Sequence, residues 1–163
     1  MKSLSFMFTF SPSQGKAMFF NGVSVVCRGD VADSEGMSIA WFTQVETDHL
    51  VLSLPGNSDV TDRLLDDSRF TLSVLSECQV PVAKMFGGSQ QKQLASDIHW
   101  QEEEALEMTE WGIPAVKNAC GVYLCEVVSE DRIEGQRIVI AKMLHREEVE
   151  GCIPLPYRKT DYF

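Results

Sequence analysis

The sequence lacks a long hydrophobic run, although 44% of its 163 residues are hydrophobic. No apolar stretch approaches the roughly 20 residues that a membrane-spanning helix requires. The first ten residues, MKSLSFMFTF, contain one lysine and an apolar core shorter than that of a secretory signal peptide. We therefore predict a cytoplasmic protein with no membrane partner.

Metal-binding side chains are also scarce. The chain has 3 histidines, which lie far apart, and 5 cysteines with no C-x-x-C pair. Zinc sites combine such ligands at short, regular spacings, so no metal site is predicted. We expect most of the cysteines to be reduced thiols of a cytoplasmic protein. Cys125 lies in the alternating run 122–128 and is expected to pack in the core.

Positive charge is the third shortage. The chain has 14 Lys and Arg against 24 Asp and Glu, which gives a net charge of −10. A nucleic acid partner is excluded, because its phosphates would meet a repelling field. Glutamates gather between residues 102 and 110, where no apolar pocket accompanies them, and this predicts a solvated face. Trp100 and Trp111 flank this segment and are expected to anchor it to the rest of the fold.

The length favours a single domain over residues 1–163. Short apolar runs separated by turn residues predict about six or seven strands and two or three short helices. Strands are expected at 23–27, 37–45, 50–54 and 70–75, and a hairpin is expected to pair 121–130 with 136–144. We predict a mainly β fold, a closed antiparallel barrel with a few short helices.

The most informative stretch is GMSIAWFTQVETDHLVLSL, residues 36–54. It reads as two strands joined by a polar turn. The hydroxyls of Ser38 and Thr43 stand among apolar and aromatic residues, with Trp41 between them. This pattern is typical of a strand that lines a pocket for a flat, partly polar ligand. An ordinary strand with solvated polar side chains is the alternative.

The next segment, GNSDVT at 56–61, leads into a helix predicted at 60–67. Hydroxyls such as those of Ser58 and Thr61, together with free backbone N–H groups at a helix start, suit a phosphate. The simpler interpretation is that Ser58 or Asp59 only caps the helix. A second short helix is predicted at 80–86, with a proline in its first turn.

With both stretches in view, the sequence resembles the flavin reductase-like family of FMN-binding split-barrel proteins. The resemblance extends from about residue 22 to residue 157 and rests on several motifs in the family's order. They are GVSVVC (22–27), GMSIAWFTQV (36–45), LVLSL (50–54), FTLSVL (70–75), KMFGG (84–88), GVYLCEVV (121–128), GQRIVIAKM (135–143) and PLPY (154–157). Members often have a Ser and two prolines at 46–49, a basic residue near Asp59, and Gly-Asp-His at 135–137. This chain differs at all three places.

The resemblance implies a split barrel of the FMN-binding type that holds FMN, or alternatively FAD, at its surface beside the second subunit of a homodimer. The cofactor-binding residues that it implies are Ser38, Ile39, Ala40, Trp41, Phe42, Thr43, Asn57, Ser58, Thr61 and Phe86. For Trp41 and Phe42 the alternative is core packing. The flavin itself carries the hydride chemistry, so no protein side chain is predicted to be catalytic.

The function implied is that of an NAD(P)H:flavin reductase, with NAD(P)H as the reductant and Gln136 and Arg137 near the nicotinamide. Such a protein could supply reduced flavin to a partner monooxygenase. The alternative is a flavoredoxin-like electron-transfer protein, which keeps FMN bound, makes no direct use of NAD(P)H and takes its electrons from a redox protein. A third reading is a relative that has lost the flavin and serves as a binding protein.

Overall fold

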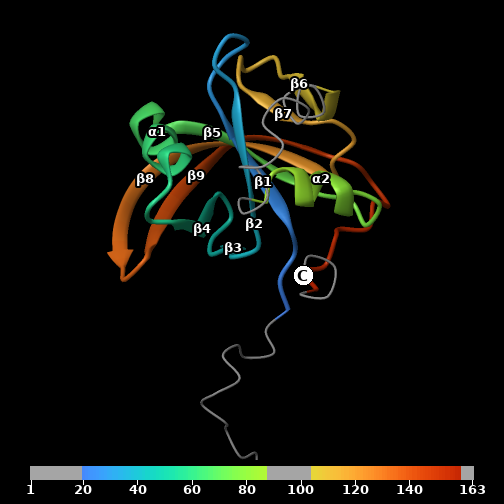
Figure 1. The fold of residues 1–163 in the computed structure, drawn as a ribbon. Helices are drawn as coiled ribbons and strands as arrows, with labels where there is room; N and C mark the ends of the chain where they lie inside the picture. Colours follow the sequence, from blue (N-terminus) through green and yellow to red (C-terminus); the bar gives the residue numbers. More distant parts are fainter. Residues whose placement is uncertain (1–19, 88–103, 159–163) are drawn as a thin grey trace, which may run out of the picture.

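The computed structural model describes residues 20–87 and 104–158 (Figure 1). Its strands are β1 (Ser24–Arg28), β2 (Glu35–Ile39), β3 (Phe42–Gln44), β4 (His49–Pro55), β5 (Arg69–Val74), β6 (Leu106–Met108), β7 (Pro114–Val116), β8 (Gly121–Ile133) and β9 (Gln136–Glu148), and its helices are α1 (Asp59–Asp67) and α2 (Val80–Met85). This part of the chain is mainly β, and both helices confirm the prediction to within a residue. Within it, no helix is long and apolar enough to cross a membrane.

Seven strands form one sheet in the order β2-β1-β5-β8-β9-β4-β3. Although β2 and β3 lie at its opposite edges, only Ala40 and Trp41 separate them in the chain. Strands lie about 4.8 Å apart, so a flat sheet of seven would separate its edges by roughly 29 Å. Three peptide units span at most about 11 Å. The sheet must therefore curl until its edges approach each other, and Figure 1 shows the resulting half-barrel.

The predicted strand 37–45 is wrong in one respect, because it is two strands. Ile39 ends β2 beside β1, and Phe42 begins β3 beside β4. The two residues of the link are neither Gly nor Pro, so no turn signal marks the break. Among the described residues no ladder joins β2 to β3. The sheet is thus an open half-barrel, and the predicted closed barrel is not shown.

Hydrophobic side chains pack on both faces of β1. Val26 belongs to a cluster that includes Leu64 of α1. Val25 belongs to a second cluster, with Phe86 at the end of α2 and Leu155 of the C-terminal tail. All five residues of β1 are buried. A strand covered on both faces needs no polar alternation, which explains why residues 25–27 are apolar without interruption.

The hairpin of β8 and β9 confirms the predicted pairing but is longer than predicted. Only Glu134 and Gly135 separate the two strands, and Glu134 adopts a left-handed φ of 52°. The polar residues 129–132, predicted as part of the strand end and turn, continue the ladder with exposed side chains. Their polarity therefore reflects exposure of the hairpin tip rather than the end of the strand.

The short pair β6 and β7 lies over one end of the sheet (Figure 1). In the turn between them, Trp111 stacks on His145 of β9 with ring centroids 5.9 Å apart. This contact confirms the predicted anchoring by Trp111. The matching prediction for Trp100 lies outside the described residues.

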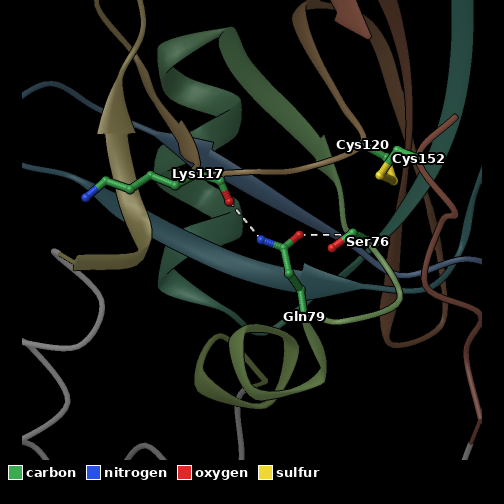
Figure 2. The surroundings of a disulfide bond; sticks show 5 residues. All are labelled: Ser76, Gln79, Lys117, Cys120 and Cys152. Carbon is green, nitrogen blue, oxygen red and sulfur yellow. Dashed lines mark hydrogen bonds between the residues drawn. A yellow bond between two sulfur atoms is a disulfide. The ribbon is translucent and has the colours of Figure 1, made fainter. Parts of the chain in front are cut away.

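Cys120 and Cys152 form a disulfide with a Cα–Cα distance of 5.3 Å (Figure 2). The prediction of reduced thiols is therefore wrong for these two residues. Cys27 and Cys125 are buried outside this bridge, as predicted, and Cys78 is exposed. The separation of 32 residues is no recognisable signature. The pairing arises because the C-terminal tail returns past the start of β8.

Candidate functional site

The turn that precedes α1 is closed by a helix cap. Ser58 Oγ accepts the backbone N–H of Thr61 at 3.4 Å, and the Ser58 carbonyl accepts that of Asp62 at 3.1 Å. The capping interpretation is therefore confirmed, and it leaves the earliest N–H groups of the helix without intrahelical partners. Asn57, the residue before the cap, is exposed. The turn thus offers hydrogen-bond donors to solvent, although two aspartates lie in the first helical turn.

Thr61 lies deeper than a surface phosphate contact would require. Its side chain is fully buried, and its Oγ1 has no hydrogen-bond partner among the described residues. A buried hydroxyl without a partner costs free energy, of the order of 1–3 kcal/mol. Thr61 is therefore the most unusual residue of the turn, and the sequence contains no signal for its burial.

The turn is held against the tip of the β8–β9 hairpin. Gly56 N–H donates to the Gly135 carbonyl at 2.8 Å, and a Cβ on Gly56 would lie 2.8 Å from that same oxygen. Glycine is therefore required at this close approach. The contact places the predicted phosphate turn beside Gln136 and Arg137, the predicted nicotinamide residues.

Both of those residues have partners within the protein. Gln136 Oε1 accepts the hydroxyl of Ser53 at 3.0 Å. Arg137 Nε donates to Glu130 at 2.9 Å, and its Nη1 to Asp62 at 3.1 Å. The hydrogen bond to Glu130 and the charge of Asp62 raise the pKa of Arg137. Arg137 thus ties α1 to the hairpin, with 15% of its side chain exposed.

The edge strand β3 lies on the other side of Ser53. The Trp41 carbonyl accepts the Ser53 N–H at 2.8 Å, and Phe42 pairs with Leu52. Trp41 is 42% exposed, whereas Phe42 is half-buried and packs against the core inside the half-barrel. The exposed indole of Trp41, whose backbone is bonded to the strand that leads into the turn, is the feature that best suits a flat ring, and Thr43 is exposed as well.

The remaining predicted residues lie at the opposite edge: Ser38 and Ile39 on β2, Ala40 in the link that follows it, and Phe86 at the end of α2. Ser38 N–H donates to the Phe86 carbonyl at 2.9 Å, and Ser38 Oγ donates to the Ala83 carbonyl at 2.7 Å. Both donors of Ser38 therefore hold the end of α2. Phe86 is buried, Ile39 is a core residue and Ala40 is half-buried.

The structure thus brings the predicted residues together in two groups joined by the two-residue link between β2 and β3. One group combines the turn before α1, β3 and the hairpin tip, and the other combines β2 and α2. In the first group, N–H donors, a hydroxyl, an exposed indole and one guanidinium fit a flat cofactor that carries a phosphate. No group of His, Cys, Asp and Glu in the described ranges could hold a metal ion.

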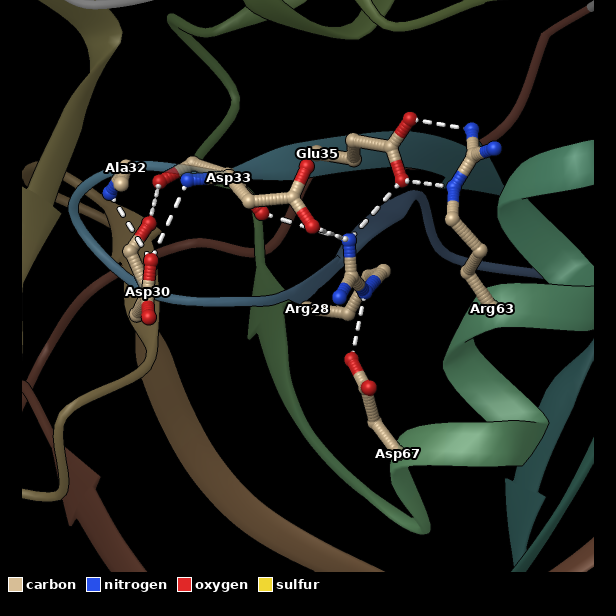
Figure 3. Close-up of polar contacts among 8 residues, drawn as sticks. Arg28, Asp30, Ala32, Asp33, Glu35, Arg63 and Asp67 are labelled. Atoms are coloured by element: carbon tan, nitrogen blue, oxygen red, sulfur yellow. Dashed lines mark hydrogen bonds and ion pairs between the residues drawn. The ribbon is translucent and has the colours of Figure 1, made fainter.

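Sequence reasoning missed Arg28, which lies at the end of β1 (Figure 3). Its side chain is buried and donates to Asp33 and Glu35, at 3.0 and 3.1 Å, and to Asp67 at the end of α1. Arg63 of α1 donates to Glu35 as well, at 2.7 Å. Hydrogen bonding to Asp67 above all raises the pKa of Arg28.

This network fixes α1 against the β1–β2 hairpin and thereby positions the turn before α1. The signal in the sequence is an arginine directly after the predicted strand 23–27, followed by a loop rich in carboxylates.

Comparison with known proteins gives both family and fold. The family model described as Flavin reductase like domain matches residues 17–163. No curated protein sequence matches the chain. Among solved structures, a candidate oxidoreductase from Sinorhizobium meliloti is 25% identical with a TM-score of 0.72. The match covers 89% of this chain and 49% of that one, so this chain spans about half of that protein's length.

Two further structures share the fold. The flavin reductase of a styrene monooxygenase from Pseudomonas putida is 22% identical, with a TM-score of 0.70 over 85% of this chain and 86% of that one. An NADH:FAD oxidoreductase from Streptomyces globisporus, in complex with NAD and FAD fragments, is 19% identical, with a TM-score of 0.73 over 85% and 81%. Because the family model spans nearly the whole sequence, this chain belongs to the flavin reductase-like domain family.

Proposed function

We propose that this protein is an NAD(P)H:flavin reductase that uses FMN, or alternatively FAD. The observation that carries the proposal is the match of the flavin reductase family model to residues 17–163. The donor-rich turn and the exposed indole of Trp41 support it. When bound, the flavin would accept a hydride from the nicotinamide and pass reducing equivalents onward.

The protein's own residues would bind and orient. Ser58 and the first N–H groups of α1 would hold the phosphate, and Trp41 would lie against the ring. Backbone groups of β3 would meet the polar edge of the ring. Gln136 and Arg137, held at the hairpin tip, would orient the nicotinamide, and correct orientation contributes strongly to rate.

The partner proposed is a monooxygenase that receives reduced flavin. Structures with this fold include the flavin reductase component of a two-component tryptophan halogenase and component B of a nitrilotriacetate monooxygenase. We also propose a homodimer that shields the flavin, since the half-barrel leaves the β3 edge, with Trp41, exposed.

A second candidate, an FMN electron carrier, is favoured by one observation. Arg137 already pairs with Glu130 and Asp62, so its charge is balanced before any nicotinamide arrives. In that case the protein would keep FMN bound and receive electrons from a redox protein.

Anaerobic stopped-flow mixing separates the two candidates. The purified protein is loaded with FMN and mixed with NADH or NADPH without air, while the flavin absorbance is recorded. A reductase bleaches the flavin with at least one nicotinamide. If the bound flavin stays fully oxidised with both, and dithionite still bleaches it, the reductase proposal fails and the electron carrier replaces it. Failure to bind FMN or FAD at all would contradict both.

A further inference from the structure

Three of the five cysteines lie on segments that come together where β5 ends. The disulfide of Cys120 and Cys152 joins the start of β8 to the C-terminal tail (Figure 2). The third, Cys78, lies in the turn between β5 and α2 and is exposed. The proposed flavin chemistry uses none of these sulfurs.

The tail runs antiparallel to the chain after β5, in a regular register. The contacts are the Leu155 N–H to the Leu75 carbonyl at 2.8 Å, a bridge between Ser76 and Pro154, and the Glu77 N–H to the Ile153 carbonyl at 2.9 Å. Cys78 and Cys152 come next along these two segments, and each belongs to a turn: the Gln79 N–H donates to the Ser76 carbonyl at 2.9 Å, and the Cys152 N–H donates to the Val149 carbonyl at 3.3 Å. A disulfide between them requires Cα atoms about 4.4–6.8 Å apart, so the two turns have to lie side by side beyond the bridge of Ser76 and Pro154.

The same turn is also fixed from the side of Cys120. Gln79 Oε1 accepts the Ser76 N–H at 2.9 Å, and Gln79 Nε2 donates to the Lys117 carbonyl at 2.7 Å (Figure 2). Lys117 lies three residues before Cys120. Cys78 is therefore held between the segments that carry the two bridged sulfurs.

We propose that Cys78, Cys120 and Cys152 form a thiol–disulfide exchange site in which Cys152 is bridged alternately to Cys120 and to Cys78. The Cys78 thiol loses its proton and its sulfur attacks Cys152 Sγ. A Cys78–Cys152 bond forms, the Cys120–Cys152 bond breaks, and Cys120 Sγ leaves with the electron pair and takes up a proton. One disulfide and one thiol exist before and after, so the step needs no oxidant or reductant.

The exposure of the three cysteines indicates which sulfur attacks the disulfide and which sulfur leaves. Cys78 is exposed and Cys152 is half-buried, so the attacking sulfur reaches the bridge from solvent. Cys120 is buried, with 8% exposure, and as a thiol it would pack as a small apolar side chain. The exchange would move the attachment of the tail from the start of β8 to the turn before α2.

The test maps disulfides in the full-length protein, purified without reductant and equilibrated with reduced and oxidised glutathione. Acid quenching, alkylation, digestion and mass spectrometry then identify the linked peptides. In the wild type we expect a Cys78–Cys152 peptide beside the Cys120–Cys152 peptide. The variant C120S should lose alkylation at Cys78 and Cys152 together and yield the Cys78–Cys152 peptide. The variant C78S should retain only Cys120–Cys152.

C125S is the matched control, because Cys125 is buried away from this corner, and its peptide pattern should equal that of the wild type. The proposal is overturned if folded C120S leaves Cys78 and Cys152 alkylated, or linked only to glutathione. Should C120S fail to fold by circular dichroism, the wild-type equilibration decides. Absence of the Cys78–Cys152 peptide there overturns the proposal.

Discussion

The lack of a side chain at Gly36 allows β2 to pack closely against the end of α2. A Cβ at this position would lie 2.9 Å from two ring carbons of Phe86 and 3.3 Å from Val25 Cγ1. The Phe86 ring is buried and cannot swing away, so the glycine is a matter of space rather than of an unusual φ. The strand can therefore accept the ring only because residue 36 has no side chain.

We expect Gly36→Ala to reduce the free energy of unfolding by about 1–3 kcal/mol, the usual cost of overpacking a core. Urea denaturation monitored by circular dichroism measures it. Gly135→Ala is the control, because a Cβ there meets no atom within 4 Å, and its stability should equal that of the wild type. Equal stability of G36A would show that the Phe86 ring yields at no cost.

The turn before α1 allows the capping and phosphate roles of Ser58 to be separated. Asp is as good an N-cap as Ser but repels a phosphate. Ser58→Asp should therefore keep the melting temperature and lose FMN affinity. Thr61→Val should retain stability, because the Thr61 hydroxyl has no partner to lose. Ser58→Ala with Thr61→Ala should weaken FMN binding at least tenfold, because the Ser58 hydroxyl would lose a hydrogen bond to a charged group worth roughly 1.5–3 kcal/mol.

Fluorescence titration of FMN into each folded variant measures these affinities. Unchanged affinity in the double variant and in S58D together would place the phosphate elsewhere. Unchanged affinity in T61V alone would remove only the Thr61 hydroxyl from the site, in agreement with its burial.

At the scale of elements, β8 carries two groups that must stay protonated. Burial raises the pKa of Cys125 to about 12. Burial and then the hydrogen bond to Glu148, at 2.7 Å, raise the pKa of Tyr123 to about 12. Both groups lie at the centre of the sheet, so their ionisation opposes the pairing of β8 with its neighbours.

Stability should therefore fall at alkaline pH. For Tyr123 the unfolded chain releases its proton near pH 10 and the folded chain near 12. The unfolded state binds fewer protons in this window, so stability is complete below pH 10 and is lost as pH rises through about 12. Tyr123→Phe should remove the part of this loss of stability that is due to the phenol, whereas the part due to Cys125 should remain. Melting temperatures from pH 8 to 12 would contradict the assignment if both proteins declined in parallel.

The ion pairs of Arg137 join two elements that also border the proposed site. Arg137→Ala should raise the Michaelis constant for the nicotinamide more than it lowers turnover, because the residue is expected to orient the donor. Asp62→Asn removes one partner but keeps the guanidinium, and it should leave that constant unchanged or lower. Steady-state kinetics at a fixed flavin concentration measures the Michaelis constant for the nicotinamide in both variants. If both variants raise the Michaelis constant for the nicotinamide equally, the effect comes from the ion pair between Arg137 and Asp62 and not from a contact of Arg137 with the nicotinamide.

Local patterns predicted elements well where the chain itself carries the signal. Ser58 at the head of a helix, the proline in the first turn of α2 and the alternation along β8 and β9 all act within a few residues. Burial of Arg28 and Thr61 depends on elements distant in sequence, so no local pattern reveals it. The pairing of Cys120 with Cys152 is hidden for the same reason.

For the whole molecule, the family resemblance identified the fold class, whereas periodicity could not order the strands. Only packing decides that β1 lies between β2 and β5, with β4 at the far side beside β9. The break after Ile39 illustrates this limit, since the residues 37–45 have the composition of one strand. This break divides the candidate residues of 38–43 between two places, because Ser38 and Trp41 lie at opposite edges of the sheet.

A homodimer is the prediction at this scale. Among the exposed apolar side chains, Trp41 and Val45 flank β3 at the edge of the sheet, and Ile140 lies on β9, two strands away. We expect multi-angle light scattering of the flavin-loaded protein at micromolar concentration to give twice the mass of the chain. A flavin-loaded monomer would contradict the proposal that a second subunit shields the cofactor.

The two-residue link between β2 and β3 also constrains how the molecule fluctuates. A sheet normally frays from its two edges independently, because each edge strand has only one neighbour. Here the edges share a tether of three peptide units, so an edge that detaches pulls on the other. Backbone amides of β2 and β3 should then exchange their hydrogens as one cooperative unit, although five strands separate them in the sheet. The half-barrel would then fluctuate by changes of twist along its strands rather than by separation of β2 from β3.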